Sequence, residues 1–172
     1  MLMHKPDHTT LVGGVIQNIA LKVEMNATLF STVINGIYSD KISSPIREIC
    51  TNAFDSHIAA GKAHVPFDVH LPSLWEQVFW VRDYGTSMSH EVIETLYSTM
   101  FASSKRDGND QVGMLGLGKM SPFAYTSGFT VTCFKDGEER TYSCFLGEDG
   151  TPGIALLGRA PTTEPDGVKV SF

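Results

Sequence analysis

The sequence predicts an α+β fold, a class in which helices and hairpin strands fill separate stretches of the chain. Apolar residues recur at helical spacing through much of residues 27–98, whereas short alternating runs separated by glycine turns fill residues 128–172. Because the later strands form hairpins, we expect a mixed, mostly antiparallel sheet with helices on one face. The length of 172 residues suits a single domain over residues 1–172.

The first third of the chain predicts two helices. Residues 10–25 alternate loosely and predict one or two strands, after which Asn26 caps a helix over residues 27–38. A second helix begins near Ser44, with a proline at its first position, and continues until Gly61 ends it. Both ends of the second helix therefore have a local physical cause.

The rest of the chain predicts short strands and a third helix. Residues 67–71 alternate, and residues 78–81 form a nearly continuous apolar run that suits a central strand. Ser89 caps a predicted helix that ends near residue 98, and the polar residues 102–111 predict a mobile loop. After a short helix we expect three or four strands, over residues 128–134, 139–146, 153–158 and 167–172.

The composition excludes several classes of protein. A net charge of -6 opposes the binding of DNA or anionic lipid through bulk charge. The three cysteines are far apart and predict neither a disulfide framework nor a zinc site, which fits a reducing cytoplasm. No apolar run approaches the roughly 18–20 residues of a membrane span, so we expect any membrane role to be peripheral. The six histidines are scattered, and we expect them at surface or ordinary polar positions.

The first candidate motif lies on the second helix, where Glu48, Asn52 and Asp55 share one face. The opposite face is apolar and carries Ile46, Ile49, Cys50, Ala53, Phe54 and Ile58. A carboxylate that orients water, beside an amide oxygen that binds Mg²⁺, would suit phosphate chemistry. The alternative is a solvated helix face, against which Asn52 argues because asparagine is a poor helix former.

The second candidate motif follows the predicted central strand. Asp83 stands at the strand end, two residues before Gly85. A carboxylate there only accepts hydrogen bonds, so it suits an exocyclic amine such as that of adenine. The alternative is an ordinary turn in which the aspartate bonds to its own backbone.

The third candidate motif is glycine-rich and comprises Gly113, Gly116 and Gly118, followed by Lys119. Its backbone amides and the start of a helix could hold phosphate groups. A flexible glycine loop is one alternative. A P-loop is another, but Met120 stands where that motif needs serine or threonine, and no apolar strand precedes the glycines.

In order and spacing, the three motifs resemble the nucleotide-binding boxes of the GHKL ATPase superfamily, which includes gyrase B, the ninety-kilodalton heat-shock chaperone, histidine kinases and MutL proteins. Residues 46–60, 101–105 and 116–126 are similar to the amino-terminal domain of the rapid-lysis A (rIIA) proteins of T-even-like phages. The resemblance spans nearly the whole chain. It implies a Bergerat-type two-layer α/β sandwich, with ATP held under a mobile lid of about residues 100–121.

The resemblance also implies a role for each motif residue. Glu48 would activate the attacking water, Asn52 would bind Mg²⁺, and Asp55 would shape the base and ribose side. Asp83 would hold the adenine amino group, and Gly85 would let the backbone approach the base. The other implied nucleotide contacts are Met88, Lys105, Gly113, Gly116, Leu117, Gly118 and Lys119.

Two positions depart from the family pattern. Ser87 occupies the place of the second glycine in the second box, which alters the expected backbone bend. Val168 stands where the family carries a threonine whose hydroxyl supports the adenine-binding aspartate. The loss of that hydrogen bond would cost about 0.5–1.5 kcal/mol if nothing replaced it.

These observations lead us to expect a domain that binds ATP and Mg²⁺ and hydrolyses ATP slowly, dependent on dimerisation or a downstream domain. The alternative is a non-hydrolysing nucleotide sensor, or a degenerate module that acts on a host or phage protein. The phage resemblance implies lysis inhibition in the cytoplasm of an infected bacterium, with a second copy, a partner protein and the inner membrane as contacts. We expect no sequence-specific binding of nucleic acid.

Overall fold

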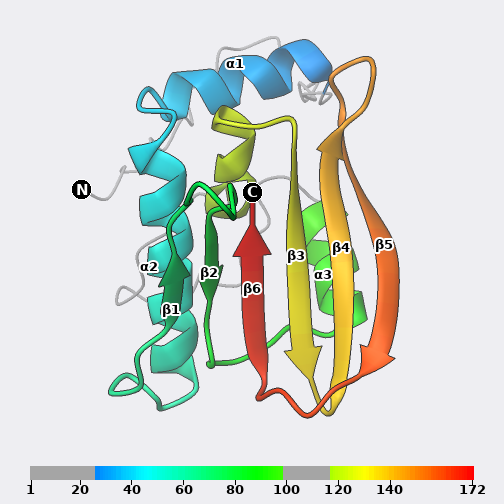
Figure 1. Ribbon diagram of the computed structural model, residues 1–172. Helices are drawn as coiled ribbons and strands as arrows, with labels where there is room; N and C mark the ends of the chain where they lie inside the picture. Colours follow the sequence, from blue (N-terminus) through cyan, green and yellow to red (C-terminus); the bar gives the residue numbers. More distant parts are fainter. Residues whose placement is uncertain (1–25, 99–116) are drawn as a thin grey trace, which may run out of the picture.

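The computed structural model describes residues 26–98 and 117–172 and has the predicted α+β fold (Figure 1). The helices are α1 (Ala27–Ile37), α2 (Ser43–Ala59), α3 (His90–Ser98) and the 3-10 helix η1 (Gly118–Ala124). The strands are β1 (Asp68–His70), β2 (Trp80–Arg82), β3 (Gly128–Lys135), β4 (Glu138–Leu146), β5 (Pro152–Pro161) and β6 (Gly167–Ser171). The predicted strands over residues 10–25 lie outside the described residues.

The strands form one sheet in the order β1-β2-β6-β3-β4-β5. Every described pairing is antiparallel, so for the described strands the prediction of a mixed sheet is wrong. The described helices stand on one side of the sheet, with α1 across its top (Figure 1). The β6 strand pairs with both β2 and β3. In its pairing with β2, Arg82 lies opposite Lys169, and the next residue, Asp83, donates its N–H to Val168 O at 2.8 Å.

The α1 helix forms one end of the main core. Asn26 caps it as predicted, because its side chain accepts a hydrogen bond from Leu29 N at 2.9 Å. The inward residues Phe30 and Ile34 are each 2% exposed. Phe30 packs edge-to-face against Phe123 of η1, with 5.6 Å between the ring centroids. This packing anchors η1 beneath α1.

The α2 helix buries a different face from the one predicted. Ile49 and Ala53 pack against β2 in a second apolar cluster, as expected. Phe54 and Ile58, however, are 48% and 44% exposed, whereas Asp55 is 5% exposed. The prediction of which face is buried is therefore wrong for the second half of α2, because the loop after β2 covers the polar side of the helix there.

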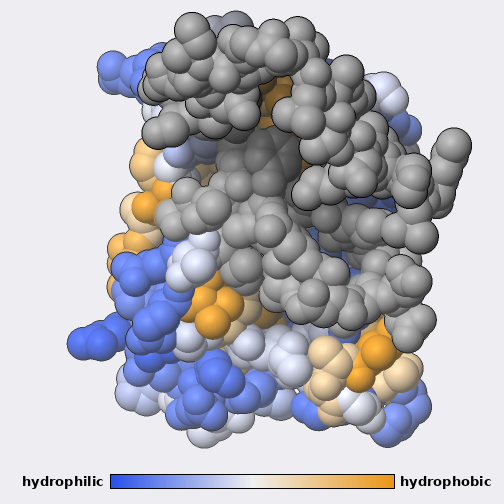
Figure 2. All heavy atoms as spheres, turned by 180° about the vertical axis from the view of Figure 1, so that it is seen from behind, coloured by the Kyte–Doolittle hydropathy of each residue, from blue (hydrophilic) through white to orange (hydrophobic). Residues whose placement is uncertain are grey.

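The β5 strand forms a long edge of the sheet. Its register with β4 shifts between Thr141 and Tyr142, which lie opposite Gly158 and Leu156, so Leu157 is an extra residue. Hydrophobic side chains appear along this side of the molecule, at the left of Figure 2. The bulge and the prolines at both strand ends oppose pairing with another strand. Among the described residues, no helix is long and apolar enough to cross a membrane.

Candidate functional site

The first half of α2 brings two predicted residues to the start of η1. Glu48 is one-quarter exposed, and its Oε1 lies 3.8 Å from the exposed Arg47 Nη2. A Cβ added to Gly118 would lie only 2.7 Å from Glu48 Oε2 and 3.7 Å from Asn52 Nδ2. A glycine is therefore needed at position 118 if Glu48 is to keep this position. The structure thus places Glu48, Asn52 and Gly118 together.

The second half of α2 lies beside Asp83, which is 5% exposed. Its Oδ1 accepts two hydrogen bonds, from Ser56 Oγ at 3.0 Å and from Gly85 N at 3.0 Å. Within residues 26–98 and 117–172, no donor is hydrogen-bonded to Oδ2. Burial raises the pKa of the Asp83 carboxyl, and the two hydrogen bonds, with the charge of Arg82 nearby, oppose that rise. Within the part of the chain that the structure describes, Oδ2 of this largely buried carboxyl can therefore accept a further hydrogen bond.

The Gly85 position lets the loop after β2 lie against α2. A Cβ at this residue would overlap the backbone and hydroxyl of Ser56. The contact is completed by Thr86, whose carbonyl accepts from Ser56 Oγ at 2.9 Å and whose N–H donates to Ser56 O at 3.4 Å. The backbone at Gly85 therefore closely approaches the α2 helix. Its approach to a nucleotide base stays a prediction.

His57 is a buried structural residue, with only 1% of it exposed. The histidines were expected at surface or ordinary polar positions, so this burial was not predicted. The Nδ1 of His57 lies 2.8 Å from Val65 O, and its Nε2 accepts from Tyr84 N at 2.8 Å. A carbonyl needs a donor and an amide needs an acceptor, so the ring is the neutral tautomer with hydrogen on Nδ1. The spacing of four residues from the buried Ala53 was the available signal, because such residues share a helix face.

The two departures from the family pattern have clear structural counterparts. Ser87 Oγ donates to Gly167 O at 2.9 Å, so this side chain joins the loop to β6. Gly167 has a φ of +149°, and a Cβ there would overlap the Asp83 carbonyl. Val168 brings no hydroxyl to Asp83, but Ser56 supplies one from α2. The Ser56 hydroxyl therefore replaces the hydrogen bond that a threonine at position 168 would make.

Arg82 supports the strand end that carries Asp83. Although only 5% exposed, its guanidinium donates to Asp83 O and, at 2.6 Å, to Pro165 O. It also lies over the rings of Tyr84 and Phe134, 4.7 and 4.0 Å from their centroids. Burial lowers the pKa of Arg82, while the nearby Asp83 opposes that change. These contacts compensate the buried charge and fix the backbone next to the site.

The other predicted nucleotide contacts differ in how deeply they are buried. Lys119 is half-buried, and burial lowers its pKa to about 8. Leu117 is 1% exposed, and the half-buried Met88 packs against the main core. Asp55 is buried on α2. Most of the predicted lid lies outside the described residues. So do three predicted nucleotide contacts: Lys105, Gly113 and Gly116.

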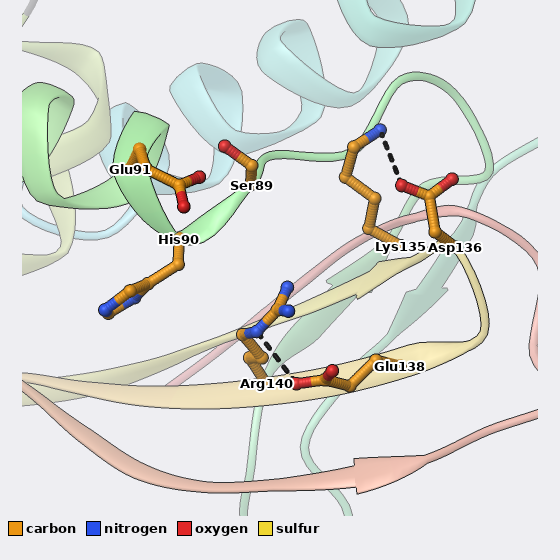
Figure 3. Close-up of a pocket in the computed structure, with 7 residues that line it drawn as sticks. All are labelled: Ser89, His90, Glu91, Lys135, Asp136, Glu138 and Arg140. Atoms are coloured by element: carbon orange, nitrogen blue, oxygen red, sulfur yellow. Dashed lines mark ion pairs between the residues drawn. The ribbon is translucent and has the colours of Figure 1, made fainter.

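A separate hollow lies between the start of α3 and the β3–β4 hairpin (Figure 3). It is lined by Ser89, His90, Glu91, Lys135, Asp136, Glu138 and Arg140. Arg140 Nε lies 2.9 Å from Glu138 Oε1, and Lys135 Nζ lies 3.9 Å from Asp136 Oδ2. Both cations already face carboxylates, so this hollow offers no uncompensated positive charge to an anionic ligand.

The donor set at Glu48 and Asn52 suits only one kind of metal binding. Across residues 26–98 and 117–172, no three His, Cys, Asp or Glu side chains cluster as a metal site. Mg²⁺ commonly takes one or two protein oxygens and fills its other positions with phosphate and water. Asn52 and the nearby Glu48 carboxylate fit an ion that arrives with phosphate groups, if the Asn52 amide turns its oxygen toward Gly118 in place of the Nδ2 that lies there.

Comparison with known proteins assigns no family to this chain. No family model matches the sequence, and no curated protein matches it significantly. The function must therefore be inferred from the residues and their geometry.

Proposed function

We propose that this chain is a GHKL-type domain that binds ATP with Mg²⁺ and hydrolyses ATP slowly. The observation that supports the proposal most is that one helix, α2, carries Glu48 and Asn52 toward Gly118 and Ser56 toward Asp83. With a rise of about 1.5 Å per residue, Glu48 and Ser56 are about 12 Å apart along the helix axis. That span is comparable to an extended nucleoside triphosphate.

The base would bind at Asp83. Its Oδ2 is an acceptor in a buried setting, where the exocyclic amine of adenine can donate to it. Hydrogen bonds to charged groups contribute about 1.5–3 kcal/mol, more than neutral ones. Asp83 would thereby supply a large share of the preference for adenine.

The phosphates would bind at the other end of the site. The backbone at the start of η1 would meet them, with Lys119 as a half-buried cation and Asn52 as a Mg²⁺ ligand. When bound, Mg²⁺ would neutralise charge on the phosphates. Glu48 would accept a proton from the water that attacks the terminal phosphorus. By the family resemblance, faster turnover would need dimerisation or a downstream domain.

The resemblance to rapid-lysis A proteins extends this proposal to a biological setting. The protein would act in the cytoplasm of an infected bacterium, peripherally at the inner membrane, in lysis inhibition. ATP binding would then control self-association or contact with a host or phage protein. This part of the proposal rests on sequence resemblance alone.

Calorimetric titration with Mg²⁺ and ATP, ADP or a non-hydrolysable ATP analogue tests the proposal. We expect micromolar binding, about -8 kcal/mol at 1 μM, that is lost in Asp83→Asn. Asp136→Asn makes the same chemical change at an exposed residue and should bind like the parent. Absence of ATP binding in a sample shown by circular dichroism to be folded would refute the proposal, as would full binding by Asp83→Asn.

The loop between β1 and β2 supports a second candidate function, partner binding without hydrolysis. Leu71, Leu74 and Trp75 are 67%, 90% and 96% exposed. Large exposed apolar side chains that gather on one loop are common at protein interfaces. In this case nucleotide would be a conformational ligand or would not bind at all. Partner binding that survives Asp83→Asn and is lost in Trp75→Ala would favour this function.

A further inference from the structure

Asp83 makes both of its described side-chain hydrogen bonds through the same oxygen. Ser56 and Gly85 donate to Oδ1 at 3.0 Å each, and no donor among the described residues is bonded to Oδ2. The Gly85 donor comes from the adjoining backbone, whereas the Ser56 hydroxyl comes from a residue 27 positions earlier in the chain. Ser56 is therefore the side chain that ties the orientation of Asp83 to α2.

We propose that Ser56 is a positioning residue that sets which purine the site accepts, by holding Asp83 in its acceptor form. The inference rests on the proposed function. An ionised Asp83 accepts from the 6-amino group of adenine and repels the 6-keto oxygen of hypoxanthine. A protonated Asp83 could instead donate to that keto oxygen. A hydroxyl that favours the ionised form thus favours ATP over inosine triphosphate, ITP.

The geometry of Ser56 links its proton to the charge on Asp83. Its Oγ lies 3.0 Å from Asp83 Oδ1 and 2.9 Å from Thr86 O, but a hydroxyl has one proton to donate. When Asp83 is ionised, donation to the carboxylate is the stronger, charge-assisted bond. When Asp83 is protonated, Ser56 can accept from the carboxyl and donate to Thr86. The Ser56 bond therefore stabilises the ionised carboxylate.

We expect the other groups that face Asp83 to stay in place when Ser56 is changed. They are His57 on α2, Arg82 on β2 and Cys133 on β3. Burial raises the pKa of the Cys133 thiol to about 12, so it is neutral in the ordinary pH range. Removal of the Ser56 donor should therefore raise the pKa of Asp83 further. ATP binding should then be lost at a higher pH as the solution is acidified.

The sheet register offers a way to move the hydroxyl. Arg82 lies opposite Lys169, and Asp83 N donates to Val168 O at 2.8 Å, so Asp83 lies opposite Val168. Residues directly opposite each other in antiparallel strands point to the same face of the sheet. Val168→Thr should therefore bring a hydroxyl, on a side chain of similar size, beside the Asp83 carboxylate from the neighbouring strand β6.

The test is calorimetric titration of ATP and ITP with Mg²⁺ between pH 5.5 and 8. We expect Ser56→Ala to weaken ATP binding about 2- to 10-fold and to lower the ATP preference over ITP by a similar factor. Its loss of ATP binding on acidification should occur at a higher pH than in the parent. Ser56→Ala/Val168→Thr should recover part of both effects, and the exposed Ser127→Ala should show neither.

Partial unfolding would not imitate this result, because ATP and ITP are compared within each variant. Ser56→Cys keeps most of the side-chain volume with a weaker donor and should fall between the parent and Ser56→Ala. An unchanged ATP preference and pH profile in Ser56→Ala, with ATP binding still lost in Asp83→Asn, would overturn the role of Ser56 alone. Absence of ATP binding in the parent would overturn the proposed function and this inference with it.

Discussion

The two halves of α2 are held in different ways. In the second half, Ser56 and His57 hydrogen-bond to the loop after β2, and Gly85 leaves no room for a side chain between them. In the first half, Glu48 and Asn52 lie beside Gly118 and make no side-chain hydrogen bond within the described residues. One half is fixed by the fold, and the polar groups of the other keep hydrogen-bonding capacity that no described residue uses.

This difference suits a site whose two ends recognise different chemistry. A buried carboxylate that selects a base must be oriented beforehand, since a misplaced acceptor would pay for desolvation without gaining a bond. Groups that meet phosphate, metal and water gain their partners from the ligand. We therefore expect substitutions in the second half of α2 to affect stability and base binding, and those in the first half to affect turnover.

The largest expected loss of stability comes from His57→Ala. The change removes two hydrogen bonds from a residue that is 1% exposed and leaves Tyr84 N and Val65 O without their partner. We expect the free energy of unfolding to fall by about 3 kcal/mol or more. Urea denaturation measures this, with the exposed His64→Ala as the matched control. Equal midpoints for the two variants would show that the base end is not fixed by His57.

Glu48→Gln should separate turnover from binding. Glutamine keeps the shape beside Gly118 but cannot accept the proton of the attacking water. We expect phosphate release to slow about 100-fold or more, whereas the ATP dissociation constant and the unfolding midpoint change little. Glu94→Gln, at an exposed position on α3, is the control. Hydrolysis at the parental rate in Glu48→Gln would remove this residue from the mechanism.

Gly85→Ala should weaken the contact between the loop and α2. Its methyl group would overlap the Ser56 backbone, so one of the two segments must shift. Overpacking of this kind costs about 1–3 kcal/mol, and ATP binding should weaken with it because Asp83 loses its alignment. Gly36→Ala places the same methyl group in open space on α1 and should not destabilise the protein. A destabilisation by Gly36→Ala as large as that by Gly85→Ala would contradict the role given to this contact.

The difference between the halves also marks what the sequence could predict. Local signals were sufficient for Asn26 as the cap of α1 and for the hairpins among the later strands, because both depend on neighbouring residues. The Glu48 and Asn52 stripe follows from helical spacing and was predicted as a candidate site. The Ser56 bond to Asp83 spans 27 residues, and burial of His57 depends on how the loop folds back. Neither has a local pattern.

The smallest expected effect is a gain in stability from Asp83→Asn at neutral pH. Burial raises the pKa of Asp83 above its ordinary value of 3.8, so the folded state binds the proton more tightly than the unfolded state. Stability should therefore fall as pH rises from 3.8 to the higher folded pKa, and remain reduced above it. Asparagine avoids the cost of burying charge, while its amide oxygen can still accept from Ser56 and Gly85. Urea midpoints at pH 7 and pH 3.5 should show the variant gaining at pH 7 and the gap narrowing in acid. A variant less stable than the parent at pH 7 would mean that the carboxylate contributes to the fold as well as to base binding.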